Sequence, residues 1–492
     1  MRREREIFRR FQEETGNRRP YRNAIVRMRK SVPTRVRVKA LRQAGLNVFL
    51  YPAARVDGCD LLSDSGTGAM TTAQWAELIE GDESYGSNEG YFLLREQLVR
   101  TFGEAWRQKD PRRPNLFIFH QGRAAEHALF TIIGKTGNNL IIPSNGHFDT
   151  TGANIEANAI TAVNLFSKEL KQRRDHPFKG DMDVGRLRTL LSEKKQKKQI
   201  PLVFLTITNN TGGGQPVSMA NIRQVSRISH RNDIPLFFDA CRFAENAYFI
   251  KQRERGYAKK SIPAIVREMF SHVDGFTVSW KKDGLSNMGG SIVLRPGGLF
   301  MKRYPELLEQ ITDHQILTEG HPTYGGLTGR DLKALARGIA TITDEGYLAH
   351  RVGQVARFGE RLQRAGVPVL TPFGGHAVYL DMNRFFEGTG LAREDYPGIA
   401  FTALLLGSYG HRLCELGDFA FGREKDGKQE FPEVNYVRAA IPRLVYEDQD
   451  LAACADAIIS LYRRREKIPG VVVTYGRDKT LRHFKAQFRL RT

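Results

Sequence analysis

Short apolar runs alternate with helix-like amphipathic stretches between about residues 115 and 295. The runs that predict strands are residues 116–119, 139–142, 162–166, 202–208, 236–239, 275–279 and 291–294. This alternation is typical of an α/β domain whose mostly parallel sheet has helices on both faces. Because ligands bind beyond the carboxyl ends of the strands in such sheets, the polar residues after each strand are the first place to look for chemistry.

The pattern changes after residue 327, where long amphipathic helices are predicted at residues 331–346 and 351–364. An apolar segment at 367–371 and an alternating run at 377–381 follow them, which indicates a smaller α+β domain. We therefore predict a basic arm at 1–20, a segment at 21–60 that contributes to the small domain, a large domain at 61–330 and the small domain at 331–492.

Composition and hydropathy narrow the class of protein. With 492 residues, 41% hydrophobic and 26% charged, the chain resembles globular proteins rather than disordered ones. No apolar stretch approaches the roughly 20 residues of a membrane span, and no apolar core follows the arginine-rich N-terminus. We expect a cytoplasmic protein without a membrane partner.

The net charge of +21 is unevenly distributed, because residues 1–40 hold fourteen Lys or Arg against four Glu. Such an arm can contact nucleic acid phosphates, or it can be a solvated extension that docks on a subunit. The chain has no nucleic-acid-binding motif, which favours the second interpretation. The four cysteines include no C-x-x-C pair, so neither a disulfide framework nor a zinc site is indicated.

The candidate chemistry centres on Asp239, at the end of one predicted strand, and Lys282, just after another. With Arg242 nearby, this pair suits pyridoxal phosphate (PLP), whose carbonyl reacts with a lysine and whose ring nitrogen is held by a carboxylate. An ordinary salt bridge between strand ends would need the same two residues.

A second segment, FHQGRAAE at residues 119–126, passes from a predicted strand through a glycine turn into a helix. Free backbone N–H groups beside Arg123 form the kind of site that binds phosphate. The same sequence is also compatible with a tight strand-to-helix turn that carries a surface arginine. Ser279, three residues before Lys282, adds a hydroxyl that can reach the same phosphate. The three signals together favour the PLP interpretation.

The sequence resembles the β-eliminating lyase family, which includes the tryptophanases and the tyrosine phenol-lyases. The matching segments are DSGTGA at 64–69, GDESYG at 81–86, HQGR at 120–123, GGQPVS at 213–218, RFAENAYFIK at 242–251, KKD at 281–283, PTYGGL at 322–327, GGHA at 374–377, VR at 437–438, IPR at 441–443 and LRHF at 481–484. They extend from about residue 40 to the end of the chain.

The resemblance implies a fold-type-I PLP enzyme whose large domain binds the cofactor. Lys282 would carry the cofactor and take the α-proton of an amino-acid substrate. The other cofactor-binding residues implied by the resemblance are Ser65, Gln121, Gly122, Arg123, Ser279 and Lys281 around the phosphate, and Phe148, Asn210, Asp239 and Arg242 around the ring.

The resemblance also assigns residues to the substrate and to a cation. Arg438 would bind the substrate carboxylate through a bidentate pair. Tyr85 would act as general acid from a neighbouring subunit of a homotetramer. Three further positions match those around the family's monovalent cation, usually potassium, for which oxygen ligands are appropriate: Gly66, Glu83 and Asn287.

The leaving group depends on four positions that the resemblance places near the substrate ring: Asp149, Leu416, His483 and Phe484. Phenol-lyases have a threonine and an arginine where this chain has Asp149 and Leu416, and His483 resembles tryptophanases. These positions favour L-tryptophan, cleaved to indole, pyruvate and ammonia, although the segment PVSMAN at 216–221 resembles the phenol-lyases.

Two alternatives to the cleavage of L-tryptophan follow from these residues. One is a related lyase that releases phenol or a thiol, and another is a basic binding protein on a degenerate enzyme scaffold, which the retained Lys282, Asp239, Arg123 and Arg438 argue against. In addition, Trp280 stands where the family has a small residue, and the sequence leaves the effect of this large ring on the pocket open.

Overall fold

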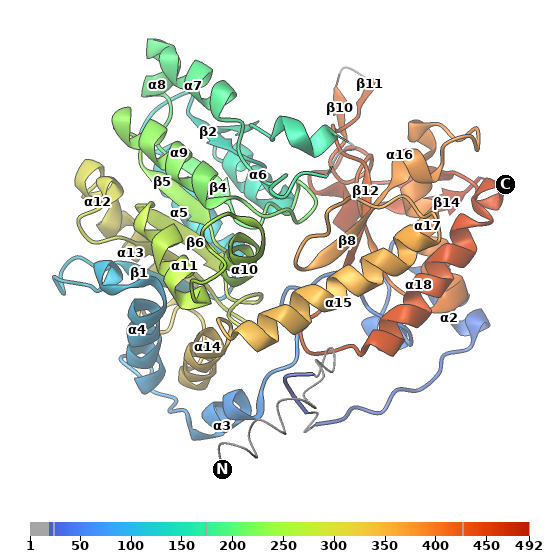
Figure 1. Cartoon of the computed structure of the whole chain (residues 1–492), viewed down its shortest axis with the longest axis horizontal. Helices are drawn as coiled ribbons and strands as arrows, with labels where there is room; N and C mark the ends of the chain where they lie inside the picture. The colour runs from blue at the N-terminus through green and yellow to red at the C-terminus, as the bar shows by residue number, and fades with distance from the viewer. Residues whose placement is uncertain (1–18, 23–24, 173–174, 426–427, 492) are drawn as a thin grey trace, which may run out of the picture.

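The computed structural model describes residues 19–22, 25–172, 175–425 and 428–491 (Figure 1). The predicted basic arm at 1–20 therefore lies almost entirely outside the described residues. The described chain forms a large domain around a seven-stranded sheet and a smaller domain around a three-stranded sheet. The prediction of an α/β fold with a large and a small domain is confirmed.

The large sheet has the strand order β1-β7-β6-β5-β4-β2-β3. Its strands are β1 (Leu116–Phe119), β2 (Ile141–Ser144), β3 (Thr161–Asn164), β4 (Val203–Thr206), β5 (Leu236–Asp239), β6 (Gly275–Ser279) and β7 (Gly290–Leu294). All neighbouring pairs are parallel except β1–β7 and β6–β7. The predicted runs locate all seven strands, and the run at 139–142 begins two residues before β2.

Alternating side chains of each strand enter two different apolar cores, because successive side chains point to opposite faces of a sheet. In β1, Leu116 and Ile118 join one core, whereas Phe117 and Phe119 join the other. The first core also receives side chains from α4 (Glu89–Phe102), α7 (Val184–Ser192), α9 (Met219–Arg231), α10 (Phe243–Arg253) and α11 (Ile262–Ser271). The second receives them from α5 (Gly122–Gly134), α6 (Asp149–Ala157), α12 (Leu299–Arg303) and α13 (Leu307–Glu319).

The small domain has an antiparallel sheet with the order β8-β12-β9 and its own apolar core. Its strands are β8 (Ala377–Asp381), β9 (Cys414–Leu416) and β12 (Tyr436–Ala440), and its helices are α16 (Met382–Phe385), α17 (Pro397–Tyr409) and α18 (Asp448–Tyr462). Two-stranded sheets are formed by β10 (Arg423–Lys425) with β11 (Lys428–Glu430), and by β13 (Val471–Tyr475) with β14 (Gln487–Leu490). In the segment predicted at 21–60, α2 (Thr34–Gln43) packs against α17.

The predicted helix at 331–346 is wrong at its C-terminal end. The structure has α14 (Gly329–Thr341) and then a new helix, α15 (Glu345–Arg364), which also contains the predicted helix at 351–364. Asp344 caps α15 by accepting a hydrogen bond from the backbone N–H of Tyr347 at 2.7 Å. A carboxylate at this position satisfies N–H groups that have no partner within the helix, so it starts a new helix.

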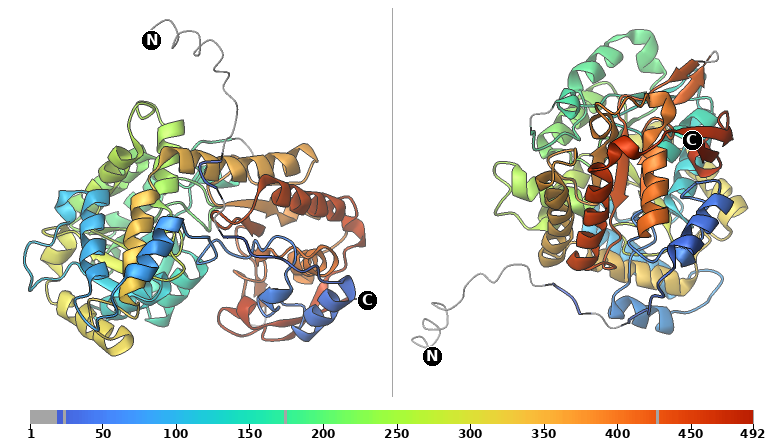
Figure 2. Two further views of the ribbon diagram at one scale, coloured as in Figure 1. Left: turned by 90° about the horizontal axis from the view of Figure 1, so that it is seen from below. Right: turned by 90° about the vertical axis from the view of Figure 1, so that its right-hand side faces the viewer.

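The predicted boundary at residue 331 lies inside α14. This helix packs against α4 and α3 (Thr72–Glu80), and its Leu332 and Leu335 belong to the core of the large domain. The following helix, α15, runs from the large domain into the small one, as two further views show (Figure 2). Its Leu348 lies in the large-domain core and its Val355 in the small-domain core.

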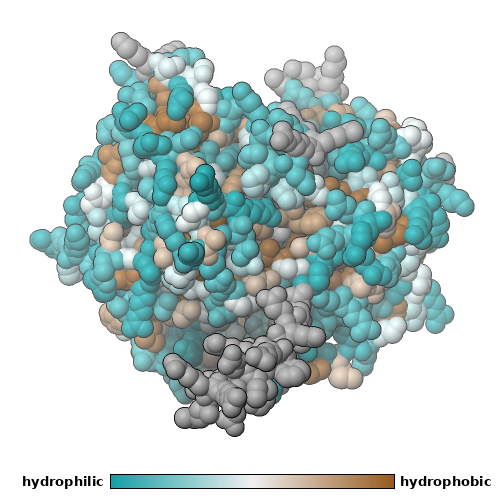
Figure 3. All heavy atoms as spheres, viewed as in Figure 1, coloured by the Kyte–Doolittle hydropathy of each residue, from teal (hydrophilic) through white to brown (hydrophobic). Residues whose placement is uncertain are grey.

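Hydrophilic residues cover most of the face seen in Figure 3, and apolar residues appear there in small groups. Among the described residues, no helix combines the length and the apolar character that crossing a membrane would require.

Candidate active site

A cavity of about 260 Å³ lies beyond the carboxyl ends of β5 and β6, where the large domain meets β9 and β12 of the small domain. Fourteen of the predicted site residues line it: Ser65, Gln121, Gly122, Arg123, Phe148, Asp149, Asp239, Arg242, Ser279, Lys281, Lys282, Leu416, Arg438 and Phe484. Tertiary folding therefore brings together residues that are up to about 420 positions apart in the sequence.

The first turn of α5 forms one wall of the cavity. No side chain caps this helix, so its first N–H groups are available to an anion. Gly122 is required there because a Cβ atom would lie 2.5 Å from the Cβ of Ser279 at the end of β6. Only a glycine lets the helix N-terminus approach the Ser279 hydroxyl, and the two together fit a phosphate group.

Three cations surround the same end of the cavity: Arg123, Lys281 and Lys282. Within the described part of the chain, none of them forms an ion pair with a carboxylate. Burial, followed by the charges of Lys282 and Arg123, lowers the pKa of Lys281. Like charges held together at this cost fit an anionic group, and a cofactor phosphate has the appropriate charge.

Asp239 lines the cavity from the end of β5, and only 5% of the residue is exposed. Its Oδ1 accepts a long hydrogen bond of 3.4 Å from the backbone N–H of Cys241, and it forms no ion pair with a described residue. A buried carboxylate needs a charged or hydrogen-bonding partner. The protonated ring nitrogen of PLP is such a partner, so this donor set fits the cofactor.

A second buried carboxyl group, Glu126 on α5, also lines the cavity, and the sequence analysis gave it no role. Its Oε1 accepts a hydrogen bond of 2.7 Å from the Thr151 hydroxyl. Burial, followed by the negative charge of Asp239, raises the pKa of Glu126 to about 8. Glu126 lies one helical turn after Gly122, and this spacing could have indicated that its side chain faces the phosphate end.

We expect the Glu126 carboxyl to make stability depend on pH. Its pKa is about 8 in the folded protein against 4.5 in an unfolded chain, so the stabilising contribution of the protonated group is complete below pH 4.5 and is lost as the pH rises towards 8. The slope is at most about 1.4 kcal/mol per pH unit. The measurement is the free energy of unfolding of the cofactor-free wild type and of Glu126→Gln between pH 5 and 8. The difference between the two proteins should change with pH, and a constant difference would contradict the prediction.

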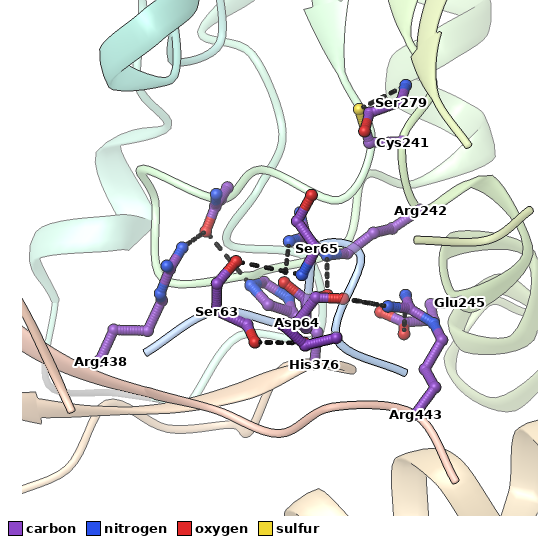
Figure 4. A network of polar contacts seen from close by, with 12 residues as sticks. Ser63, Asp64, Ser65, Cys241, Arg242, Glu245, Ser279, His376, Arg438 and Arg443 are labelled. Carbon is purple, nitrogen blue, oxygen red and sulfur yellow. Dashed lines mark hydrogen bonds and ion pairs between the residues drawn. The ribbon is translucent and has the colours of Figure 1, made fainter. Parts of the chain in front are cut away.

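Arg438 projects from β12 towards the cavity, as Figure 4 shows. Its Nη1 donates to Oδ1 of Asn210 at 3.3 Å, its Nη2 donates to the carbonyl of Leu62 at 3.1 Å, and its Nε has no described partner. These two contacts orient the guanidinium while leaving donors free. The group therefore suits a carboxylate ligand.

Asn210 and Arg242 are engaged by other protein groups. Asn210 is not among the lining residues, and its Oδ1 accepts a 2.6 Å hydrogen bond from the Tyr379 hydroxyl. Arg242 lines the cavity and forms a bidentate ion pair with Asp64. Contacts of either residue with the 3-oxygen of PLP remain a prediction.

Part of the cavity wall is apolar and aromatic. Leu416 and Phe484 lie there with Phe49, which the sequence analysis missed because it is distant in sequence from every motif. The rings of Phe49 and Phe484 meet edge to face with centroids 4.7 Å apart. Phe49 belongs to the segment at 21–60, which therefore contributes directly to the cavity.

His483 does not line the cavity but contacts a residue that does. Its Nε2 lies 3.1 Å from Oδ2 of Asp149, and both side chains are buried. Trp280 is not among the residues that line the cavity. Its fully buried indole lies in the large-domain core and donates to the Ser291 hydroxyl at 2.9 Å, because the strand directs this side chain away from the cavity.

The remaining predicted residues lie outside the cavity wall. Tyr85 is 72% exposed, and its ring packs edge to face against Tyr324. Asn287 donates to the carbonyl of Gly66 at 3.0 Å, whereas Glu83 pairs with Arg330. In the described chain, no cluster of three or more His, Cys, Asp or Glu side chains is arranged to hold a metal ion.

Comparisons with known proteins identify the family of the chain. Residues 60–457 match the family model of the β-eliminating lyases. A tryptophanase of Salinibacter ruber is 44% identical over 454 residues, which are 92% of this chain and 91% of that protein. A tyrosine phenol-lyase of a Symbiobacterium species is 38% identical over 471 residues, which are 95% of this chain and 98% of that protein.

Solved structures share the fold at low sequence identity. An aspartate aminotransferase of Thermotoga maritima aligns with a TM-score of 0.56 at 13% identity, covering 87% of this chain and 95% of that one. An aromatic aminotransferase of Pyrococcus horikoshii aligns with the same TM-score at 14% identity, covering 83% and 96% of the respective chains. With the family match, these findings show that the chain belongs to the β-eliminating lyase family and is a PLP-dependent lyase.

Proposed function

We propose that this protein cleaves L-tryptophan to indole, pyruvate and ammonia. The observation that carries the proposal is the apolar and aromatic part of the cavity wall, which is formed by Phe49, Leu416 and Phe484. An indole ring buries a large apolar area against such a wall. Curated relatives include both tryptophanases and tyrosine phenol-lyases, so they do not identify the substrate. The choice of L-tryptophan in this proposal therefore rests on the apolar wall.

Each step of this reaction is assigned to a particular residue of the chain. When bound, PLP supplies a ring that accepts electrons from the substrate Cα. Asp239 keeps a proton on the ring nitrogen, and Lys282 takes the proton from Cα. Arg438 holds the substrate carboxylate and thereby fixes which bond of Cα faces Lys282. Tyr85 of a neighbouring subunit donates a proton to the aromatic carbon, which then departs as indole.

The Asp149–His483 pair supports indole over phenol. Both side chains are buried, and Asp149 lines the cavity, so its carboxylate can accept a hydrogen bond from an indole N–H. Leu416 offers no hydrogen-bond donor for a phenol oxygen. A related lyase that acts on L-tyrosine or on an S-substituted cysteine is the alternative.

The test is incubation of the PLP-loaded protein with L-tryptophan, L-tyrosine, S-methyl-L-cysteine and L-serine, scoring pyruvate and each leaving group separately. The proposal requires the highest kcat/KM for L-tryptophan with equal amounts of indole and pyruvate. A higher kcat/KM for any other member of the panel would overturn it, and the family assignment would stand.

The contacts of Arg438 predict the effect of a conservative change. Arg438→Lys keeps the positive charge but loses the planar pair of donors, so we expect KM for L-tryptophan to rise about 10- to 100-fold. Cofactor binding should stay close to that of the wild type, because Arg438 contacts no phosphate-site residue. Steady-state kinetics with a parallel PLP titration measures both, and an unchanged KM would remove Arg438 from the carboxylate site.

Three further features belong to the proposal and rest on family resemblance. The protein forms a homotetramer in which Tyr85 completes the site of its neighbour, and the exposure of Tyr85 in the single chain leaves it available for this role. Potassium binds near Gly66, Glu83 and Asn287. The enzyme acts in the cytoplasm on a free amino acid. Sedimentation at micromolar concentration and activity assays with and without potassium test the first two features.

A further inference from the structure

Arg443 lies at the centre of a buried charge cluster beneath the active site (Figure 4). Only 2% of the residue is exposed. Its Nη1 donates to Oδ2 of Asp64 at 2.9 Å, and its Nη2 donates to Oε1 of Glu245 and to Oδ1 of Asp283, both at 2.8 Å. One guanidinium thus binds carboxylates from three segments of the large domain.

Two of these carboxylates are directly next to active-site residues in the sequence. Asp64 precedes Ser65, and its carboxylate also accepts two hydrogen bonds from Arg242, at 2.7 and 3.0 Å. Asp283 follows Lys282. A shift of either carboxylate would therefore move a residue of the cofactor site.

The second oxygen of Asp283 has a structural partner of its own. It accepts a 2.8 Å hydrogen bond from the backbone N–H of Ala244, in the first turn of α10. Both oxygens of Asp283 are thus held, one by α10 and the other by Arg443. The loop that carries Lys282 is fixed between a large-domain helix and a small-domain arginine.

The backbone around Arg443 ties the same segments to the small domain. Arg443 follows β12, the strand that carries Arg438, and its carbonyl accepts a 2.9 Å hydrogen bond from the N–H of Ala69. The last residue of β12, Ala440, donates to the carbonyl of Leu61 at 2.9 Å. The segment at 61–69 is thus held along the small domain on both sides of Asp64.

The buried carboxylates of this cluster depend on Arg443 for their charge balance. Burial raises the pKa of Asp64, but the charges of Arg242, His376 and Arg443 hold it well below its usual value, so the group is ionised. Without Arg443, the carboxylates of Glu245 and Asp283 would remain buried with fewer cations. Buried charges that lose a partner force the surrounding structure to rearrange or to take up a proton.

We propose that Arg443 is a positioning residue that locks the small-domain strand carrying Arg438 to the large-domain loops carrying Ser65 and Lys282. The role rests on the proposed function, in which Arg438 holds the substrate carboxylate. Arg443 thereby sets the distance between the carboxylate site and the cofactor site. Loss of Arg443 would therefore displace residues of both the carboxylate site and the cofactor site, although Arg443 itself contacts neither ligand.

Arg351 on α15 provides a matched control. It is equally buried, at 2% exposed, and its Nε donates to the same Glu245 Oε1 at 3.2 Å. It forms no hydrogen bond with Asp64 or Asp283. Arg351→Met therefore removes one buried cation from the cluster without releasing the two active-site loops.

The experiment compares Arg443→Met and Arg351→Met with the wild type in three measurements: thermal unfolding of the cofactor-free protein, equilibrium titration with PLP, and steady-state kinetics with L-tryptophan. We expect both variants to lower the unfolding temperature. Only Arg443→Met should raise the Kd for PLP and the KM for the amino acid, each by at least about 10-fold, which corresponds to about 1.4 kcal/mol.

Two results would overturn the proposal. One is an Arg443→Met protein whose Kd for PLP and KM match those of the wild type, and the other is equal losses in both variants, which would indicate general destabilisation. If Arg443→Met does not fold, Asp283→Asn takes its place, because Asp283 pairs with Arg443 and does not line the cavity. The same rise in the Kd for PLP is expected, and an unchanged Kd would again overturn the proposal. The PLP titration does not depend on the leaving group, so a wrong substrate leaves this test valid.

Discussion

Replacing Lys282 with alanine is expected to abolish turnover while the fold remains intact. Lys282 lines the cavity together with Asp239 and supplies both the amine that joins the cofactor and the base that takes the α-proton. Losing a covalent attachment and a general base in one step should lower kcat by at least about 10³-fold. Pyruvate release under saturating L-tryptophan and PLP measures the loss, with circular dichroism as the check on folding.

Lys281→Ala is the matched comparison, because the neighbouring lysine contributes a positive charge at the phosphate end. We expect this variant to bind PLP more weakly yet to keep most of its turnover at saturating cofactor. After borohydride treatment with PLP, mass spectrometry should find the label on residue 282 in wild type and in Lys281→Ala. A Lys282→Ala protein that releases pyruvate at near the wild-type rate would falsify the assignment of the catalytic lysine.

Changing the apolar wall is expected to change the preferred substrate. The double variant Leu416→Arg with Asp149→Thr introduces a donor for a phenol oxygen and removes the carboxylate that pairs with His483. A site that hydrogen-bonds a hydroxyl group discriminates by as much as 10⁴- to 10⁵-fold, whereas apolar fit gives about 10- to 200-fold. The ratio of kcat/KM for L-tyrosine to that for L-tryptophan should therefore rise by more than about 10²-fold.

The two single variants and Leu416→Met serve as controls. Leu416→Met keeps the size and the apolar character of the wall, so its ratio should stay near that of the wild type. Because both residues line the same cavity, the double variant should shift the ratio by more than the product of the two single effects. A wild type that already prefers L-tyrosine would refute the apolar-wall argument.

Several parts of the site could be predicted because they are local in sequence. The strand-to-helix turn at Gln121 and Gly122 has to present free N–H groups, since a helix start without a capping side chain leaves them unpaired. The alternation of apolar runs likewise locates the seven strands, because a strand buried on both faces needs an apolar run. Asp239 and Lys282 follow two of these strands and therefore reach the same edge of the sheet.

Other parts depend on contacts that no local pattern encodes. Phe49 reaches the cavity only because α2 packs on α17 and directs the segment after it towards Phe484. The raised pKa of Glu126 needs both its burial and the nearby Asp239. Trp280 directly precedes the lysine pair, yet the direction of its side chain places it in the core.

By itself, the sequence determined the fold class, the cofactor and the residues at the strand ends, since these follow from periodicity and from motifs of a few residues. Tertiary structure decided how the two domains meet. Arg443 and Asp64 are 379 positions apart in the sequence. Their ion pair forms only because the end of β12 packs along the segment before Ser65. A buried charge is tolerated only where folding brings its partners together, so its role becomes visible in three dimensions.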